Sequence, residues 1–174
     1  MSSTSIQTSA PASVQRLPVA RPRLPDAQAL LPYLERIDSA RWYSNFGPLL
    51  TEFETRLEAR FRRPTGVATC VNGTQAITLA LTAMGVRQGG LCAMPAWTFA
   101  ATAHAAVQAG LVPWFLDVDP VTWMLDPAHV ARSLESAPGP VSAIVPVAAF
   151  GQVPDLAAWM RFREETGVPV LMDA

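Results

Sequence analysis

Residues 71–77, Val-Asn-Gly-Thr-Gln-Ala-Ile, are of the types that bind a phosphate group. The β-branched residue before Asn72 indicates the end of a strand, and Gly73 allows a sharp turn into a helix. The first turn of a helix leaves backbone N–H groups without partners, and such groups bind anions. We therefore expect the N–H groups near Gly73 and the hydroxyl of Thr74 to form a phosphate site, although the tripeptide alone also fits an ordinary strand-to-helix turn.

Residues 94–101, Met-Pro-Ala-Trp-Thr-Phe-Ala-Ala, bring aromatic side chains to the end of the next expected strand. Phe99 or Trp97 could stack on a flat ring attached to the phosphate, but core packing explains either residue equally well. Asp173 ends another apolar run, where a carboxylate is costly unless it meets a cation or several donors. A protonated pyridine nitrogen is such a cation, so the pattern favours pyridoxal phosphate (PLP). Taken alone, Asp173 would be interpreted as a helix cap.

The basic residues set a limit on how this chain could hold PLP. All 13 are arginine, so the chain has no lysine amine to form a Schiff base with the cofactor or to act as its base. No catalytic residue is therefore assigned. The chain ends in an apolar run, residues 170–174, with no turn or helix after it, and we interpret it as the front part of a longer enzyme.

Two other nucleotide-binding patterns do not occur in this sequence. A dinucleotide site would require G-x-G-x-x-G after a strand, and a P-loop would require a lysine after its second glycine. Metal binding is not expected either, because no Cys/His spacing fits zinc and the acidic loop near residue 119 lacks the glycine of a calcium loop. The residues that we assign instead to packing, turns or surface positions are Cys70, Cys92, His104, Asp117, Asp119 and His129.

Composition limits the class of protein. Half of the 174 residues are apolar, which is enough for a substantial core in one domain. The net charge is −1, and no concentrated basic region suggests nucleic-acid binding. No run approaches the roughly 18 apolar residues of a membrane span, and the first 15 residues lack the core of a signal peptide. We expect a cytoplasmic protein that binds neither nucleic acid nor membrane.

The positions of breaks and apolar residues divide the chain into three parts. Residues 1–24 are rich in Ser, Thr, Pro and Arg, and we expect a disordered tail. For residues 25–66 we expect a helical segment. It would contain a short helix within residues 26–40, starting near Pro32, and a second helix from Pro48. The second helix would turn one apolar stripe toward a core, formed by Leu50, Phe53, Leu57 and Phe61.

From residue 67 onward, strands and helices alternate. The predicted strands are residues 67–71, 91–94, 112–118, 142–147 and 168–173, and the predicted helices are residues 74–84, 98–109, a helix opened by Asp126-Pro127, and 154–166. Strands that are apolar on both faces and separated by helices are typical of a buried parallel sheet. The predicted fold is therefore α/β, with a mainly parallel sheet and helices on both faces. In such a sheet, ligands bind at the carboxyl ends of the strands, where the loops described above lie.

Read together, these motifs resemble the DegT/DnrJ/StrS family of PLP-dependent sugar aminotransferases, a branch of the fold-type I superfamily. The resemblance runs from about Leu24 to Ala174 and depends on six motifs in the same order. They are Tyr-Ser-Asn-Phe-Gly-Pro from residue 43, Asn-Gly-Thr-Gln-Ala-Ile from 72, Pro-Ala-Trp-Thr-Phe-Ala-Ala-Thr from 95, Phe-Leu-Asp-Val-Asp-Pro from 115, Pro-Val-Ala-Ala-Phe-Gly-Gln from 146, and Asp-Ala from 173.

The resemblance implies a role for four residues. Gly73 and Thr74 would hold the cofactor phosphate, Phe99 would stack on the pyridine ring, and Asp173 would pair with the ring nitrogen. Residues 67–174 would form the first part of the large domain, incomplete at its C-terminal end, and the catalytic lysine would lie beyond Ala174. The loop of residues 43–48 would approach the active site, and the complete protein would be a homodimer. Ala148 stands where the family commonly has histidine.

The resemblance also implies a reaction: transfer of an amino group from glutamate or glutamine to a keto sugar, which would be linked to a nucleotide. The 174-residue chain alone would be inactive because it lacks the lysine. Two alternatives stay open. One is a non-catalytic relative that binds a ligand or regulates, and the other is a different fold-type I enzyme, such as an aldolase or desulfurase. The particular sugar, the aminated carbon and the amino donor are not encoded in these motifs.

Overall fold

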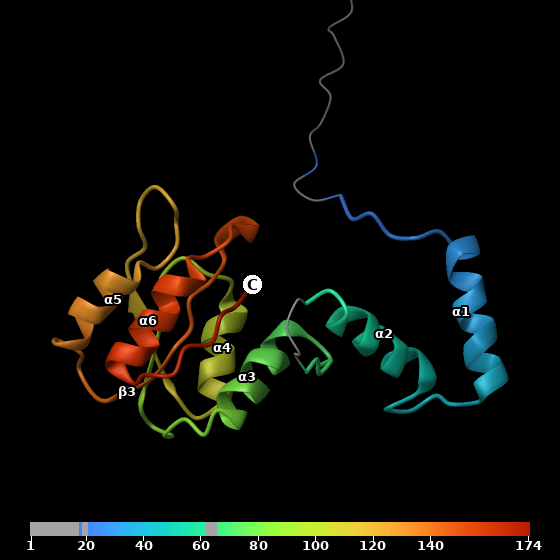
Figure 1. Cartoon of the computed structure of the whole chain (residues 1–174), viewed down its shortest axis with the longest axis horizontal. Helices are drawn as coiled ribbons and strands as arrows, with labels where there is room; N and C mark the ends of the chain where they lie inside the picture. Colours follow the sequence, from blue (N-terminus) through green and yellow to red (C-terminus); the bar gives the residue numbers. More distant parts are fainter. Residues whose placement is uncertain (1–17, 19–20, 62–65) are drawn as a thin grey trace, which may run out of the picture. The chain divides into compact units, whose positions relative to one another are not determined.

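The computed structural model describes residue 18, residues 21–61 and residues 66–174 (Figure 1). Most of the tail predicted over residues 1–24 therefore lies outside the described residues. Residues 21–24 are exposed and have no regular secondary structure.

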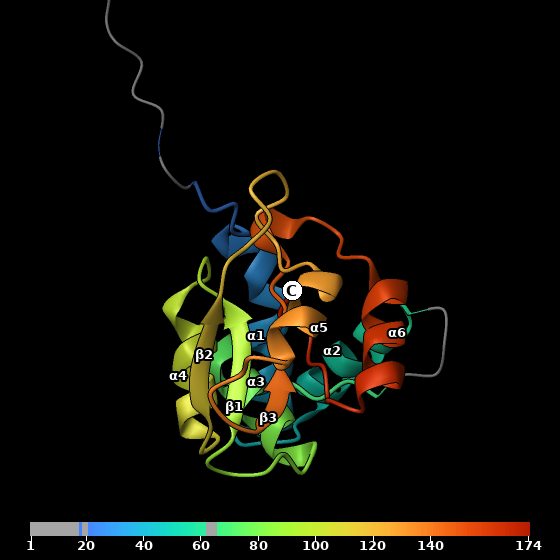
Figure 2. The same cartoon turned by 90° about the vertical axis from the view of Figure 1, so that its left-hand side faces the viewer.

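Three parallel strands form the sheet: β1 (Leu91–Pro95), β2 (Val112–Leu116) and β3 (Val141–Ile144). They lie in the order β2-β1-β3, with β1 in the centre (Figure 2). The parallel α/β fold predicted from sequence is confirmed. Residues 168–173 run beside β3 and make only two isolated bridges, Ile144 to Val170 and Val147 to Asp173, rather than the continuous strand that we expected.

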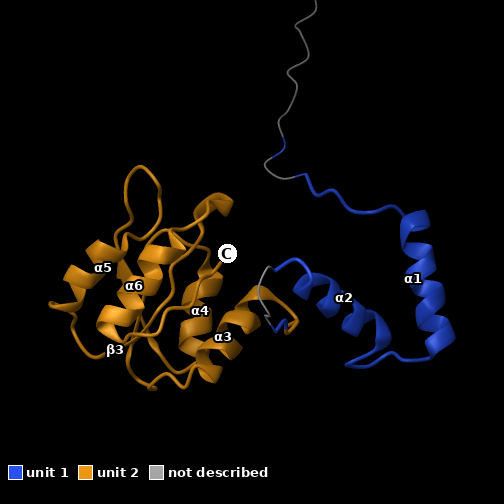
Figure 3. Ribbon diagram, viewed as in Figure 1, with its two compact units in different colours: residues 1–67 blue, residues 68–174 orange. Residues whose placement is uncertain are grey.

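The chain divides into two compact units, Met1–Val67 and Ala68–Ala174 (Figure 3). The sheet belongs to the second unit, together with α3 (Gly73–Ala83), α4 (Ala100–Gln108), α5 (Pro127–Leu134), the short 3-10 helix η1 (Ala149–Gly151) and α6 (Leu156–Thr166). The strand predicted over residues 67–71 does not form, because no neighbouring strand pairs with it among the described residues. Its apolar pattern alone does not supply hydrogen-bond partners.

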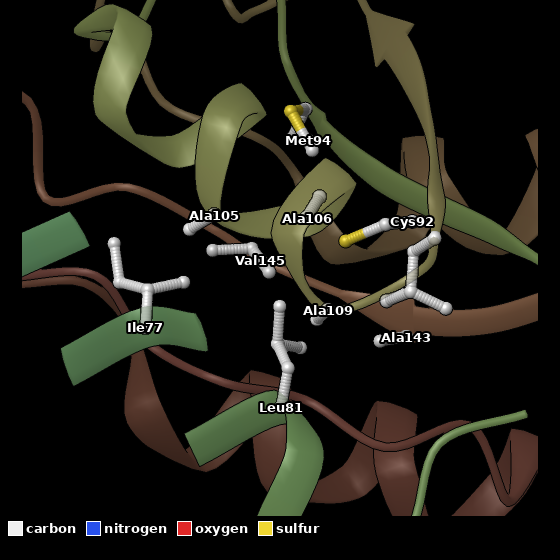
Figure 4. Packing of buried hydrophobic residues seen from close by; sticks show 10 residues of the cluster. Ile77, Leu81, Cys92, Met94, Ala105, Ala106, Ala109, Ala143 and Val145 are labelled. Atoms are coloured by element: carbon white, nitrogen blue, oxygen red, sulfur yellow. The ribbon is translucent and has the colours of Figure 1, made fainter. Parts of the chain in front are cut away.

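Helices α3 and α4 cover one face of the sheet. Ile77 and Leu81 of α3 and Ala105, Ala106 and Ala109 of the α4 region form this core. They pack on Cys92 and Met94 of β1, on Ala143 of β3 and on Val145 just after β3 (Figure 4). Small alanine side chains on α4 allow the helix to lie close to the strands. Burial raises the pKa of the Cys92 thiol to about 12, so this cysteine is a packing residue, as predicted.

Helices α5 and α6 cover the opposite face. Val130 of α5 and Trp159 and Phe162 of α6 pack with Ala93 and Ile144, the strand residues that point away from the first face. Because successive strand residues alternate between faces, one short apolar strand supplies both cores. The two-faced arrangement predicted from the apolar strands is confirmed.

The first unit contains two helices, α1 (Ala27–Ala40) and α2 (Pro48–Glu58). We expected the first helix to start near Pro32, but it begins at Ala27 because the carboxylate of Asp26 accepts the N–H of Ala29 at 2.9 Å. The cap, rather than the proline, sets the start of this helix. Pro48 occupies the first turn of α2, as predicted.

The apolar stripe predicted for α2 is not buried. No residue of α1 or α2 is buried, and Phe61 lies beyond the end of the helix at Glu58. Two short helices enclose too little volume to remove such side chains from water. An ion pair between Arg36 and Glu52 joins the two helices, and the hydrogen bond and charge of Arg36 lower the pKa of the Glu52 carboxyl.

Candidate cofactor site

The start of α3 presents unpaired hydrogen-bond donors. Asn72 caps the helix: its side-chain oxygen accepts the N–H of Gln75 at 2.9 Å, and its carbonyl accepts the N–H of Ala76 at 3.0 Å. Within residues 66–174, no protein group accepts the N–H of Gly73 or of Thr74, and the Thr74 hydroxyl has no partner. The two N–H groups and the hydroxyl left at this helix start can therefore bind an anion.

Gly73 has a different role from the sharp turn that we expected. It is the first residue of α3, and its φ angle is not in the left-handed region. The sharp change of direction falls at Asn72, which has extended backbone before the helix. A Cβ atom at position 73 would meet nothing within 4 Å. The glycine is thus required neither by the backbone nor by packing, and its open side lies next to the two free N–H groups.

Helices α3 and α4 begin at the same edge of the sheet. The loop from α3 enters the amino end of β1, and there the N–H of Gly89 donates to the carbonyl of Gly110, just after α4, at 2.7 Å. Both helices therefore end at the amino edge and run in the same direction. Thr78 and Ala105, each the sixth residue of its helix, are in contact, with the Thr78 hydroxyl 3.4 Å from the Ala105 carbonyl. The two helix starts therefore lie at similar height, at the carboxyl edge.

Phe99 stands at the N-cap of α4 with its side chain 82% exposed. It borders a cavity of about 600 Å³ that is lined by residues 96–99 and 147–150. The competing aromatic residue, Trp97, packs edge-to-face on Trp123 with ring centroids 4.8 Å apart and also lies near Phe150. Among the described residues Phe99 has no such ring contact, so its exposed ring could stack on a flat ligand.

Asp173 is held at the same edge by its backbone and its side chain. Its N–H donates to the Pro146 carbonyl at 2.9 Å, and its carbonyl accepts the N–H of Ala148 at 2.8 Å. Its carboxylate oxygen Oδ2 accepts a hydrogen bond from the hydroxyl of Thr102 at 2.7 Å. The carboxylate of Asp173 thus contacts Thr102, which lies one helical turn after Phe99 in α4.

Two threonines at this edge received no role from the sequence. Thr102 is 1% exposed, and its hydroxyl is also 2.8 Å from that of Thr98. A buried hydroxyl needs a partner, so a threonine on the buried side of an alanine-rich helix is a signal for a polar contact. The sequence could indicate that Thr102 has a partner, but it could not indicate which one.

The possible metal ligands of this chain are its cysteine, histidine and acidic side chains. No cluster of three or more His, Cys, Asp or Glu side chains that could hold a metal ion occurs among the described residues. Asp119 accepts the N–H groups of Val121 and Thr122 at 3.0 and 2.7 Å, and these bonds lower the pKa of its carboxyl. It is a turn residue, as predicted.

The structure brings the four predicted residues to one edge, and their chemistry fits PLP. Gly73 and Thr74 offer donors to a phosphate, Phe99 offers an exposed ring, and Asp173 offers an oriented carboxylate. A parallel α/β unit with these groups at its carboxyl edge is the partial large domain of a fold-type I aminotransferase.

The chain belongs to the DegT/DnrJ/EryC1/StrS aminotransferase family, which matches residues 26–174. It is 38% identical over 129 residues to UDP-2-acetamido-2-deoxy-3-oxo-D-glucuronate aminotransferase of Pseudomonas aeruginosa, covering 74% of this chain and 34% of that protein. It is 32% identical over 167 residues to protein Rv3402c of Mycobacterium tuberculosis, covering 93% of this chain and 40% of that protein. The chain thus spans about two fifths or less of these relatives.

Solved structures show the same fold. DesI, solved in the presence of its TDP-sugar product, matches with a TM-score of 0.74 and 38% identity, over 88% of this chain and 38% of that chain. NtdA of Bacillus subtilis, solved with bound cofactor PMP, matches with a TM-score of 0.76 and 28% identity, over 84% of this chain and 33% of that chain. The predicted cofactor class is confirmed for the family. No described helix has the length and apolarity needed to span a membrane.

Proposed function

We propose that this chain forms the cofactor-binding part of a PLP-dependent aminotransferase. The reaction would move an amino group from glutamate or glutamine to a keto sugar linked to a nucleotide. The observation that carries the proposal is the placement of the Asp173 carboxylate beside the start of α4, at the edge where α3 presents its free N–H groups. The sugar relatives support the substrate class.

Each residue would make one contact with the cofactor. The N–H groups of Gly73 and Thr74, with the Thr74 hydroxyl, would bind the phosphate at the positive end of α3. Phe99 would cover one face of the ring. Asp173 would keep the pyridine nitrogen protonated, because a carboxylate favours the charged form of a neighbouring base. When bound, PLP supplies an electron-accepting ring for substrate chemistry.

We extend the proposal to the complete protein. It would act as a cytoplasmic homodimer, and the loop of residues 43–48 would approach the active site. That loop lies between α1 and α2, where Trp42, Tyr43 and Gly47 help to line a cavity of about 540 Å³. The 174-residue chain itself would bind PLP reversibly and would not transfer amino groups, because it has no lysine.

Two measurements test the proposal. Titration of the chain with PLP, followed by cofactor absorbance, should show saturable binding that inorganic phosphate competes away. The complete protein encoded by the gene should convert a nucleotide-linked keto sugar to an amino sugar when glutamate or glutamine is supplied. If neither the 174-residue chain nor the complete protein binds PLP, the cofactor site is refuted. If the complete protein binds PLP but transfers no amino group, the reaction is refuted.

The alternative of a non-catalytic relative also agrees with the absence of lysine from the 174 residues. The protein could bind PLP or a related phosphate ester without catalysis and act as a ligand-binding or regulatory protein. Borohydride reduction separates the two functions, because it permanently labels a lysine that is bound covalently to PLP. A label on the complete protein supports the aminotransferase, and a complete protein that binds PLP without becoming labelled supports the non-catalytic function.

A further inference from the structure

We propose that Thr102 is the positioning residue of the candidate site: it orients the Asp173 carboxylate so that one oxygen is fixed and the other faces the pyridine nitrogen. This inference rests on the proposed function, because it concerns the same carboxylate. Thr102 does not touch the cofactor in this proposal and acts only through Asp173.

The hydroxyl of Thr102 behaves differently from the other helical threonine hydroxyls in the described residues. Five of the others donate to a carbonyl four residues earlier, namely Thr55, Thr78, Thr82 and Thr166 at 2.8–2.9 Å and Thr51 at 3.3 Å. The sixth, Thr74 at the start of α3, has no partner among the described residues. Thr102 instead donates to a carboxylate 71 residues away, at 2.7 Å. Its bond links α4 to the segment beside β3 and does not serve its own helix.

Thr102 has one hydroxyl proton, and this determines which groups donate in its contacts with Asp173 and Thr98. An ionised carboxylate only accepts, so Thr102 must give its single hydroxyl proton to Asp173. The contact of 2.8 Å between Thr98 and Thr102 must then run from Thr98 to Thr102. Two hydroxyls thus form a chain that ends on the carboxylate, and such chains strengthen each bond in them.

The two linked hydroxyls fix the rotation of the Asp173 side chain, which the backbone hydrogen bonds leave free. The Asp173 backbone is held by Pro146 and Ala148, but those bonds do not set the rotation of the side chain. Thr102 is 1% exposed, so its hydroxyl cannot exchange this bond for one with water. Oδ1 of Asp173 has no partner among the described residues, so it is the oxygen available to the ring nitrogen.

Three substitutions test the positioning role on the 174-residue chain loaded with PLP. Thr102→Val keeps the branched shape and removes the hydroxyl, whereas Thr102→Ser keeps the hydroxyl. Thr82→Val is the matched control, because the Thr82 hydroxyl bonds only a carbonyl of its own helix. The readouts are the dissociation constant of PLP and the pH midpoint at which the absorption spectrum of bound PLP reports loss of the pyridine-nitrogen proton.

We expect Thr102→Val to weaken PLP binding about tenfold and to lower the spectral midpoint by about one pH unit, because a misoriented carboxylate favours the protonated nitrogen less. Thr102→Ser and Thr82→Val should match the parent chain. If Thr102→Val does not fold, Thr98→Val removes the outer hydroxyl from a partly exposed position and should shift the midpoint in the same direction by less.

The outcomes separate this inference from the proposed function. If the parent chain binds PLP and the valine variants at 102 and 98 leave both readouts unchanged, the positioning role is overturned while the cofactor site stands. If the parent chain binds no PLP, the proposed function fails and the inference fails with it. A midpoint shift in Thr102→Val with rescue by Thr102→Ser supports the role, because simple loss of packing would not be rescued by the smaller residue.

Discussion

Replacing Gly73 with alanine separates what the fold needs from what the ligand needs. The added methyl would meet no atom within 4 Å, and the φ angle of Gly73 is not in the left-handed region. The substitution should therefore leave the fold intact. Alanine is up to about 1 kcal/mol more favourable than glycine inside a helix, with less expected at its first residue, so the melting temperature should stay the same or rise slightly.

The same methyl would occupy the space that a phosphate needs in order to reach the free N–H groups of Gly73 and Thr74. A hydrogen bond to a charged group contributes about 1.5–3 kcal/mol. Loss of one such bond corresponds to a roughly ten- to hundredfold rise in the dissociation constant, since about 1.4 kcal/mol is tenfold. Gly73→Ala should thus bind PLP ten- to hundredfold more weakly while remaining as stable as the parent chain.

Gly139→Ala is the matched control. Gly139 precedes the start of β3, at the amino edge, its φ angle is not left-handed, and its Cβ would make only ordinary contact with Leu91 at 3.9 Å. Both variants should be titrated with PLP and melted thermally. If Gly73→Ala binds PLP as tightly as Gly139→Ala, the phosphate does not approach the start of α3 and the proposed site is wrong.

Three further predictions concern other residues of the second unit. Asp173→Asn should keep the bond from Thr102 but lose the charge, so PLP affinity should fall at least about tenfold. Asp126→Asn, which still caps α5 as asparagine, should not change that affinity. Phe99→Leu should leave the melting temperature unchanged, because the side chain is 82% exposed, and should weaken PLP binding about two- to tenfold; equal binding would exclude stacking. Denaturant unfolding at several pH values should show stability falling by about 1.4 kcal/mol per pH unit between the ordinary thiol pKa of 9.0 and about 12, because Cys92 ionises in the unfolded chain first. A flat profile in that window, or a profile unchanged by Cys92→Ala, would contradict this assignment.

The elements with local signals could be predicted from the sequence. Asp126 caps α5 as predicted, and Gly85 and Gly110 follow the ends of α3 and α4. The helix predicted from residue 154 begins two residues later, at Leu156, with Asp155 as its cap. These signals act over three or four residues, so they can be recognised without knowing the fold. The alternation of apolar strands and helices then led to a parallel sheet with two covered faces.

The predictions that were wrong concern features that depend on partners far away in the sequence. Residues 67–71 and 168–173 have the same apolar character as β1, yet only residues 168–173 find a neighbour, and then at two bridges. A strand exists only where another strand pairs with it, and composition does not show this. The stripe on α2 is amphipathic as predicted, but amphipathicity does not show what would cover it.

The candidate site shows the same division. Gly73, Thr74, Phe99 and Asp173 could be selected because each lies at a strand end or helix start with a recognisable residue type. Thr102 could not be assigned a role, because its partner lies 71 residues further along the chain. Single residues that contact a ligand were therefore easier to find than a residue that acts through another residue.

The two-faced character of β1 has a consequence for how this chain tolerates change. Cys92 and Met94 belong to the core with α3 and α4, whereas Ala93 belongs to the core with α5 and α6. Deleting Ala93 would place Met94 next to Cys92 in the strand and turn the methionine toward the opposite face, into space that now accommodates a methyl group. Length variation is thus forbidden in β1, whereas exchange of one apolar side chain for another of similar volume is permitted.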